Sequence, residues 1–242
     1  AALGFGTESI PKVRKVVGPG SPAVTLAQVE MQRHGLATMM LLGPTESLVV
    51  ADDTAHVGRL ASDLLIEAEH GTDSSVVLVC TSQDIIDAVE NELQIQIGDL
   101  PANRAEACRA SLGDNGGAIL VTSLTEAIDV ANVYAPEHCQ VAVSAQHEEM
   151  VVDGIINAGE ILIGQHTPFS AGNFVIGVPA SLPTSGFAHV SSGITVNAFL
   201  KHTAIAKANE TALRRMAPTV IALSDHEGFP AHGNAIRRRF PE

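Results

Sequence analysis

Glu67 and His70 are the side chains of this sequence whose types and spacing most directly suggest chemistry. They lie in the stretch from Ala55 to Gly71, whose apolar residues recur at the i, i+3, i+4 spacing of a helix with one buried stripe. Both project from the flank of that stripe, within roughly 60° of each other. A carboxylate and an imidazole so placed can bind one metal ion. The alternative is a surface Glu and a His that the helix dipole stabilises, and a metal site needs further ligands.

Composition restricts the class of protein. The 242 residues suffice for one large domain or two small ones, and 45% hydrophobic residues suffice for a sizeable core. A net charge of −13 argues against sequence-independent nucleic-acid binding. We see neither an apolar run of the ~20 residues that a membrane span needs nor a secretory signal pattern. Three widely spaced cysteines fit a reducing compartment. We therefore expect a soluble, cytoplasmic protein that binds neither nucleic acid nor membranes.

Strand-like and helix-like stretches alternate along the middle of the chain. We predict strands at 48–51, 75–80, 118–121, 140–143 and 161–163, and helices at 55–71, 82–100, 124–133 and 147–158. This alternation predicts an α/β fold, a Rossmann-like parallel sheet flanked by helices. The flanking segments are predicted to contain a strand at 13–17, a helix at 25–34, an apolar run at 39–42, an ordered loop at 167–186, and a helical C-terminal tail at 196–207, 210–223 and 230–239.

The position of His138 conflicts with the usual place of ligands in such a sheet. Ligands of parallel sheets normally bind beyond the carboxyl ends of the strands. His138 follows a predicted helix and precedes the next predicted strand, which puts it at the amino end. It can be a buried, hydrogen-bonded core histidine or an acid–base residue.

Five motifs, taken in order, resemble those of the histidinol dehydrogenase family. They are DLLIEAEHG (63–71), APEH (135–138), TPFSAGN (167–173), LPTSGFA (182–188) and PAHGNAI (230–236). The resemblance covers essentially the whole chain, which corresponds to about the second half of a family member. It implies a remnant of the cofactor-side domain at 1–45, a main Rossmann-like domain at 46–190 with a site loop at 167–186, and a helical tail at 191–242 that is exchanged between subunits.

The resemblance further implies a zinc-dependent, NAD-linked homodimeric enzyme that oxidises an amino alcohol to the acid. The implied metal ligands are Glu67, His70, Asn173 and His232 of the partner subunit. In the implied acid–base pair, Glu137 activates water and His138 accepts protons. The implied binding residues are Thr45 and Glu227 for substrate, and Pro19, Gly20 and Ser21 for cofactor.

Two of these ligands depart from the family's pattern. The family has Gln where this chain has Glu67, and Asp where it has Asn173. One carboxylate, one amide and two imidazoles therefore remain, with the formal charge unchanged. Such donors still suit zinc or a similar divalent ion.

The substrate pocket departs further. The family has an Asn-His pair at Pro179-Ala180 and a Glu at Phe169. Each lost charge-assisted hydrogen bond is worth about 1.5–3 kcal/mol, so affinity for a polar amino alcohol falls. Phe169 and Pro179 also predict a more apolar pocket, and we expect an alcohol less polar than histidinol. The alternative is a truncated, non-catalytic paralogue that serves as a binding or assembly module.

Overall fold

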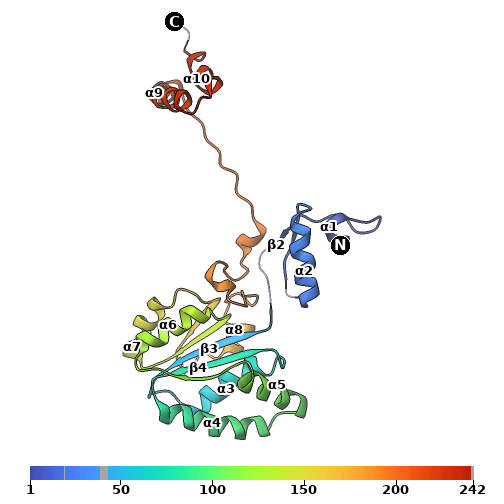
Figure 1. Ribbon diagram of the computed structural model, residues 1–242, viewed down its shortest axis with the longest axis vertical. Helices are drawn as coiled ribbons and strands as arrows, with labels where there is room; N and C mark the ends of the chain where they lie inside the picture. Colours follow the sequence, from blue (N-terminus) through green and yellow to red (C-terminus); the bar gives the residue numbers. More distant parts are fainter. Residues whose placement is uncertain (19, 39–42, 241–242) are drawn as a thin grey trace. The chain divides into compact units, whose positions relative to one another are not determined.

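The computed structural model describes residues 1–18, 20–38 and 43–240. The chain divides into two units, Ala1–Phe199 and Leu200–Glu242, which are described separately (Figure 1). The predicted apolar run at 39–42 and the predicted cofactor residue Pro19 lie outside the described residues. The assignment of 1–45 to a cofactor-side domain stays a prediction. None of the described helices is both long and apolar enough to cross a membrane.

The larger unit is built on a five-stranded parallel sheet. Its strands are β3 (Glu46–Ala51), β4 (Ser75–Cys80), β5 (Gly117–Leu120), β6 (His138–Ala142) and β7 (Glu160–Ile163). They lie in the order β5-β4-β3-β6-β7. Strand β4, and β3 after its first residue, consist of apolar or small residues because helices cover both of their faces, whereas β6 also carries His138 and Gln140. The predicted parallel α/β sheet flanked by helices is confirmed.

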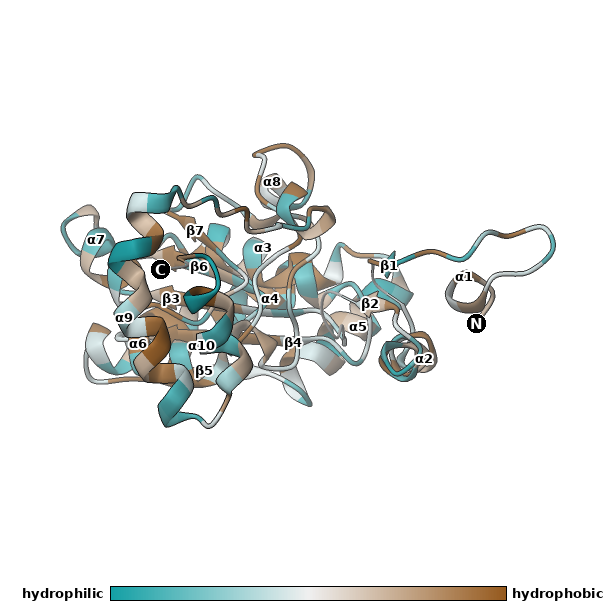
Figure 2. Cartoon of the chain, turned by 90° about the horizontal axis from the view of Figure 1, so that it is seen from above, coloured by the Kyte–Doolittle hydropathy of each residue, from teal (hydrophilic) through white to brown (hydrophobic). Residues whose placement is uncertain are grey.

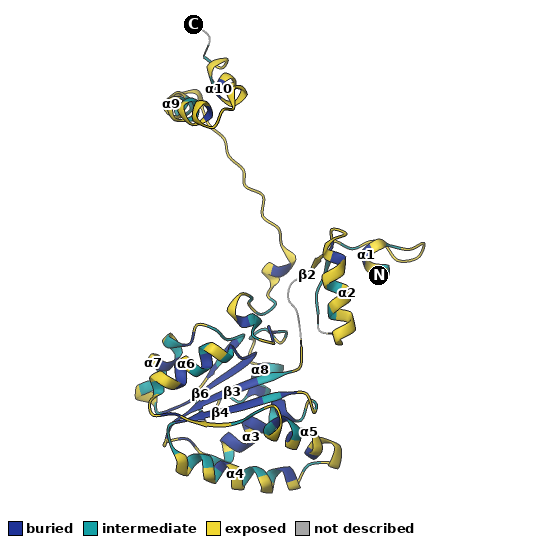
Figure 3. Cartoon of the chain, viewed as in Figure 1, coloured by how far each residue is buried: buried dark blue, intermediate teal, exposed yellow. Residues whose placement is uncertain are grey.

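The covering helices form two layers (Figure 1). They are α3 (Val57–Ala68), α4 (Gln83–Gly98) and α5 (Ala102–Gly113) on one face, and α6 (Leu124–Tyr134) and α7 (Ala145–Gly154) on the other. Alternate residues of β3 and β4 enter the two cores, so Val49 packs toward α3 and Val50 toward α6. Figure 3 shows β3, β4 and β6 buried and the covering helices buried along one side only, whereas the edge strand β5 is largely exposed.

Several predictions of secondary structure need correction. Strand β6 begins at His138 rather than residue 140, because His138 pairs with strands on both sides. Helix α5 was not predicted, since only small residues such as Ala105 and Cys108 mark its buried face. The predicted loop at 167–186 contains a helix, α8 (Phe169–Phe174).

The helix predicted at 196–207 is also wrong. Only a short 3-10 turn forms, at Val196–Phe199, and residues 200–209 have no regular structure. Nearly all side chains from 199 to 209 are exposed, so a helix here has no surface against which to bury an apolar face. A short helix without such burial is marginal in water.

Residues 1–18 and 20–38 contain two short helices and two short strands. They are α1 (Ala2–Phe5), β1 (Lys15–Val16), α2 (Pro22–Gln32) and β2 (Ala37–Thr38), with β1 and β2 paired in parallel. Helix α2 begins with proline at its first position, where no backbone N–H is needed. Leu3, Phe5 and Leu26 remain largely exposed, and apolar residues are visible on this segment in Figure 2.

The smaller unit is a helical hairpin of α9 (Glu210–His226) and α10 (Pro230–Arg237). Gly228 joins them with a φ of 73°, a conformation that favours glycine. Arg237 bridges to Asp225 at 3.1 Å, and the guanidinium of Arg214 lies 4.3 Å from the ring centre of Phe240. Among this unit's described residues only Ser224 and Gly233 are buried, so it has little core of its own.

Candidate functional site

A cleft of about 500 Å³ opens at the amino ends of the sheet strands. Six of the predicted site residues line it: Thr45, Glu67, His70, Glu137, His138 and Asn173. They come from the start of β3, the end of α3, the start of β6, and α8. The expectation that a ligand site lies beyond the carboxyl ends of the strands is therefore wrong for this cleft. His138, at the amino end of β6, lines it.

At the carboxyl ends of the strands, opposite the cleft, Asp52 links the loops that follow β3 and β6. This buried carboxylate follows β3 and accepts hydrogen bonds from the backbone N–H of Ser144 at 2.8 Å and of Thr54 at 3.0 Å. Burial alone would raise the pKa of Asp52, but these hydrogen bonds outweigh it and hold the pKa below its usual value. The carboxylate ties together the loops after β3 and β6, where the winding of the sheet reverses. A Rossmann-like sheet normally binds its ligand at that point.

Polar side chains of helix α3 and strand β6 meet in pairs because they are spaced by similar distances along the two elements. Asp63 and Glu67 are one helical turn apart, and His138 and Gln140 are two residues apart on one strand face. A helical turn and a two-residue strand step each advance the chain by about 6 Å, so the two pairs meet. Gln140 donates to Asp63 at 2.8 Å, and Nε2 of His138 lies 3.9 Å from Oε1 of Glu67. All four side chains are buried.

The carboxylate of Glu67 joins the predicted metal ligands. Nδ2 of Asn173 donates to Oε1 of Glu67 at 2.8 Å, and Nδ1 of His70 lies 3.3 Å from Oε2. Glu67 is only 1% exposed, whereas His70 lies at the cleft's mouth, with half of its side chain exposed. The structure thus brings together three of the four predicted ligands, although Glu67 and Asn173 are 106 residues apart in the sequence.

These donors fit a divalent metal ion. Nδ1 of His70 lies 3.1 Å from the carbonyl oxygen of Ile66, which leaves Nε2 as the nitrogen for a metal. One carboxylate, one imidazole and one amide oxygen are then available, a set that suits zinc or a similar ion. Within the described ranges no three His, Cys, Asp or Glu side chains are arranged so that they could hold a metal ion by themselves, so the set needs a further ligand. The predicted fourth ligand, His232, lies in α10 of the smaller unit.

His138 lies among three carboxylates. Nδ1 lies 2.5 Å from Oε1 of Glu160, and Nε2 lies 3.8 Å from Oε2 of Glu137 and 3.9 Å from Glu67. Burial alone would lower the pKa of His138, but the hydrogen bond to Glu160 and the surrounding negative charge raise it. Glu160 was not predicted from the sequence. The available signal was its place at the start of the strand that neighbours His138.

Glu137 is a carboxylate whose protonation changes near neutral pH. It is 8% exposed, and burial raises its pKa to about 7, although the neighbouring His138 opposes the shift. Oε2 accepts a hydrogen bond from the backbone N–H of Glu46 at 3.2 Å. A carboxyl group with this pKa can both accept and donate a proton near neutrality.

The remaining predicted residues have varied placements. Phe169 is fully buried with its ring centre 5.7 Å from that of His138, and neither Phe169 nor Pro179 is among the residues that line the cleft. The prediction that these two make the pocket apolar is therefore wrong. Its apolar lining instead includes Ile66, Phe174, Ala180 and Leu182. Gly20 and Ser21 precede α2, and Glu227 follows α9.

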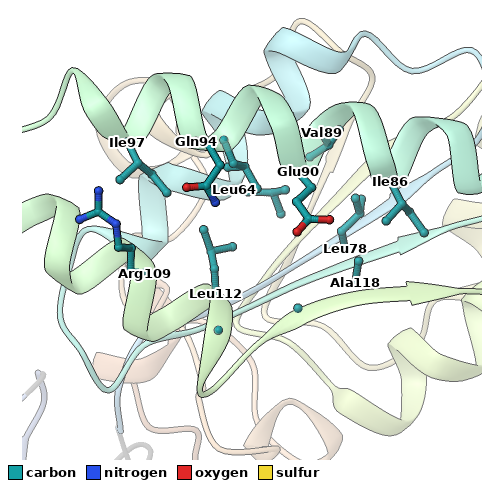
Figure 4. Close-up of a pocket in the computed structure, with 13 residues that line it drawn as sticks. Leu64, Leu78, Ile86, Val89, Glu90, Gln94, Ile97, Arg109, Leu112 and Ala118 are labelled. Atoms are coloured by element: carbon teal, nitrogen blue, oxygen red, sulfur yellow. The ribbon is translucent and has the colours of Figure 1, made fainter.

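A second hollow, of about 340 Å³, lies between α4, α5 and the β5 edge of the sheet (Figure 4). Apolar side chains such as Ile86 and Leu112 form most of its wall, and Arg109 is among the few polar ones. None of the predicted site residues lines this hollow, whereas six of them line the cleft at the amino ends.

The family model described as "Histidinol dehydrogenase" matches residues 1–240. This chain belongs to the histidinol dehydrogenase family. Histidinol dehydrogenases from Methanosarcina mazei and Synechocystis sp. are 39% and 42% identical to it over 240 residues. Each match covers 99% of this chain and 54% of the relative, so the chain spans about half the length of these curated relatives.

Solved structures agree with this family assignment. The crystal structure of histidinol dehydrogenase from Elizabethkingia anophelis matches with a TM-score of 0.94 and 35% identity, over 98% of this chain and 54% of that chain. An acetylating aldehyde dehydrogenase from Geobacillus thermoglucosidasius matches with a TM-score of 0.51 and 13% identity, over 82% of this chain and 58% of that chain, which shows a shared fold alone. The resemblance carried by the five motifs is thus confirmed.

Proposed function

We propose that this chain forms the metal- and substrate-binding half of an NAD-linked dehydrogenase of the histidinol dehydrogenase family, acting on an alcohol. One observation carries the proposal: His70 and Asn173 both contact Glu67 in the same cleft as Glu137 and His138. Three oxygen and nitrogen ligands beside an acid–base pair are what a metal-assisted oxidation of an alcohol requires.

The proposed metal ligands are Glu67, His70, Asn173 and His232 of the partner subunit. A bound divalent ion would supply Lewis-acid polarisation of the substrate oxygen, and NAD would supply the hydride acceptor. The buried Glu67 supports this assignment, because a carboxylate that is 1% exposed needs a positive partner or strong hydrogen bonds.

The acid–base work is assigned to His138 and Glu137. Nε2 of His138 accepts the proton of the substrate hydroxyl during the first oxidation. Glu137 activates a water molecule for a second oxidation, from the aldehyde to the acid. A pKa of about 7 suits Glu137 to this task, since the group is then partly ionised and basic enough to take a proton from water.

Substrate and cofactor contacts are assigned to segments around the cleft. Thr45 lines the cleft, and Glu227 of the partner subunit would reach the substrate from the tail. Pro19, Gly20 and Ser21 would contact NAD. The apolar side chains in the cleft's lining, with Ala180 where the family has a histidine, support an alcohol less polar than histidinol.

The proposed assembly is a cytoplasmic homodimer in which the C-terminal tails are exchanged. Support comes from the hairpin of α9 and α10, where Leu223 is 56% exposed and Phe229 53%. Two helices with so little buried surface need another surface to cover their apolar residues. A second copy of the chain would supply that surface and gain a metal ligand in return.

Metal analysis and an alcohol screen test the proposal. The natural full-length protein that carries these residues would be purified, its zinc content measured, and NADH formation followed with a panel of alcohols. His70→Ala is expected to lose zinc and turnover, whereas His166→Ala, an exposed histidine at the opposite edge of the sheet, keeps both. A wild-type protein that holds no divalent metal and oxidises no alcohol would overturn the proposal in favour of a non-catalytic binding or assembly module.

A further inference from the structure

We propose that Glu160 is the positioning residue that holds the imidazole of His138 in one orientation and one tautomer for proton transfer. The inference rests on the proposed function, in which His138 accepts the substrate's proton. Glu160 and His138 are the first residues of the neighbouring strands β7 and β6 and are direct partners in the parallel register. Paired residues project to the same face of a sheet, which brings Oε1 of Glu160 to 2.5 Å from Nδ1.

This contact selects the tautomer of His138. An ionised carboxylate can only accept hydrogen bonds, so the proton of the neutral ring resides on Nδ1. The lone pair is then on Nε2, the nitrogen 3.8 Å from Oε2 of Glu137 and 3.9 Å from Oε1 of Glu67. The basic nitrogen is therefore the one nearest the cleft's catalytic carboxylate. An imidazole held by a carboxylate on one nitrogen so that the other can act as a base is an established arrangement in enzymes.

The surroundings of Glu160 are shaped to hold its carboxylate. The side chain is 3% exposed, and Phe169 packs edge-on to the ring of His138. Gly172 of α8 lies beside the carboxylate, where an added Cβ would come within 3.1 Å of Oε1 and 3.2 Å of Oε2. The absence of a side chain at residue 172 thus leaves the space that the carboxylate occupies.

The energetics favour a functional reason for this carboxylate. Oε2 of Glu160 is buried and accepts no hydrogen bond from the described residues. A buried carboxylate with one oxygen left unpaired costs stability, and an apolar side chain of similar size would avoid that cost. Stability alone therefore does not account for a glutamate here. The contact of Glu160 with Nδ1 of His138 gives a functional reason for it.

The test compares Glu160→Gln with Glu160→Asp in the natural full-length protein. Gln keeps the shape of the side chain but can offer an N–H to Nδ1 and so favour the wrong tautomer, whereas Asp keeps the negative charge. We expect Glu160→Gln to lower kcat by about 10²- to 10⁴-fold, the usual worth of an acid–base group, with KM and zinc content within about twofold of wild type. Glu160→Asp retains more kcat than Gln. Glu149→Gln, an exposed glutamate on α7, is the matched control and leaves kcat unchanged.

A spectroscopic measurement separates this inference from the proposed function. In protein labelled with ¹⁵N-histidine and held at a pH above the raised pKa of His138, with the signals assigned by loss in His138→Gln, the neutral ring should show a protonated Nδ1 and an unprotonated Nε2. Glu160→Gln should abolish that pattern. A wild-type ring protonated on Nε2 instead, or a Glu160→Gln variant with wild-type kcat, would overturn the inference. If no alcohol is oxidised, the proposed function fails while the ¹⁵N pattern still decides the role of Glu160. If Glu160→Gln does not fold, the wild-type spectrum and Glu160→Asp decide it.

Discussion

Nδ2 of Asn173 donates a hydrogen bond to Oε1 of Glu67 across 2.8 Å, although 106 residues separate them in the sequence. The family has Gln at the position of Glu67 and Asp at the position of Asn173, so this chain has exchanged the amide and the carboxylate. Because the two side chains touch, this exchange keeps one negative charge at one place in the cleft. The contact explains how both departures can coexist with a metal site.

The first prediction concerns this pair. Glu67→Gln removes the carboxylate from the trio Glu67, His70 and Asn173, and we expect zinc affinity to fall by tenfold or more, since charge-assisted contacts are worth about 1.5–3 kcal/mol. Asn173→Asp places two carboxylates in contact and by itself also changes the affinity for zinc. The double variant restores one carboxylate and one amide and should recover most of the affinity, as measured by competition with a chelator. Strictly additive losses in the double variant would contradict this coupling.

The second prediction concerns the pH dependence of stability. The pKa of Glu137 is raised from its ordinary value of 4.5 to about 7, so the folded protein retains a proton that the unfolded chain releases. The free energy of unfolding of the metal-free protein should therefore fall as pH rises from 4.5 to 7, by an amount on the order of 3 kcal/mol. Glu137→Gln should flatten that slope in urea titrations, and the exposed Glu149→Gln should not. An unchanged slope in Glu137→Gln would refute the pKa shift.

The third prediction concerns the carboxyl edge of the sheet. Asp52→Ala leaves the part-buried N–H groups of Ser144 and Thr54 without their acceptor, and each hydrogen bond to a charged group is worth about 1.5–3 kcal/mol. We expect the free energy of unfolding to drop by about 2–4 kcal/mol, whereas Asp53→Ala, its exposed neighbour, changes little. Because the pKa of Asp52 is lowered, its contribution is present at neutral pH and is lost as pH falls below the usual value of 3.8. Equal stability of the two variants would count against the role of Asp52.

The fourth prediction concerns the proposed homodimer. Leu223→Asp places a charge on an exposed apolar position of α9, so it should weaken the assembly if that surface is covered by a second copy. Light scattering would show a shift toward monomer and metal analysis a loss of zinc, because His232 of the partner subunit is then absent. Thr219→Asp, an exposed polar position on the same helix, is the control. A Leu223→Asp variant that stays dimeric and retains its zinc would argue against tail exchange.

The sequence by itself determined the elements whose patterns are local. Strand β4 was predicted at its observed bounds, because a strand covered on both faces is a continuous apolar run. Glu67 and His70 were found together because three residues along a helix bring side chains to neighbouring positions whatever the rest of the chain does. Helix α5 was missed because small buried residues leave no clear apolar period. The helix at 196–207 was predicted wrongly, because periodicity says nothing about whether a surface exists to receive the apolar face.

Tertiary structure decided how the site is assembled. The pairing of Glu160 with His138 depends on the register of β6 and β7, and that register is set by core packing along the whole of both strands. The contact of Asn173 with Glu67 depends on α8 forming where the composition suggested a loop. The cleft lies at the amino ends of the strands because the start of β3, the end of α3, the start of β6 and helix α8 meet there. The fold also places Phe169 of α8 against the ring of His138. Local propensities act over a few residues, whereas these contacts join segments that only the folded core brings within reach of one another.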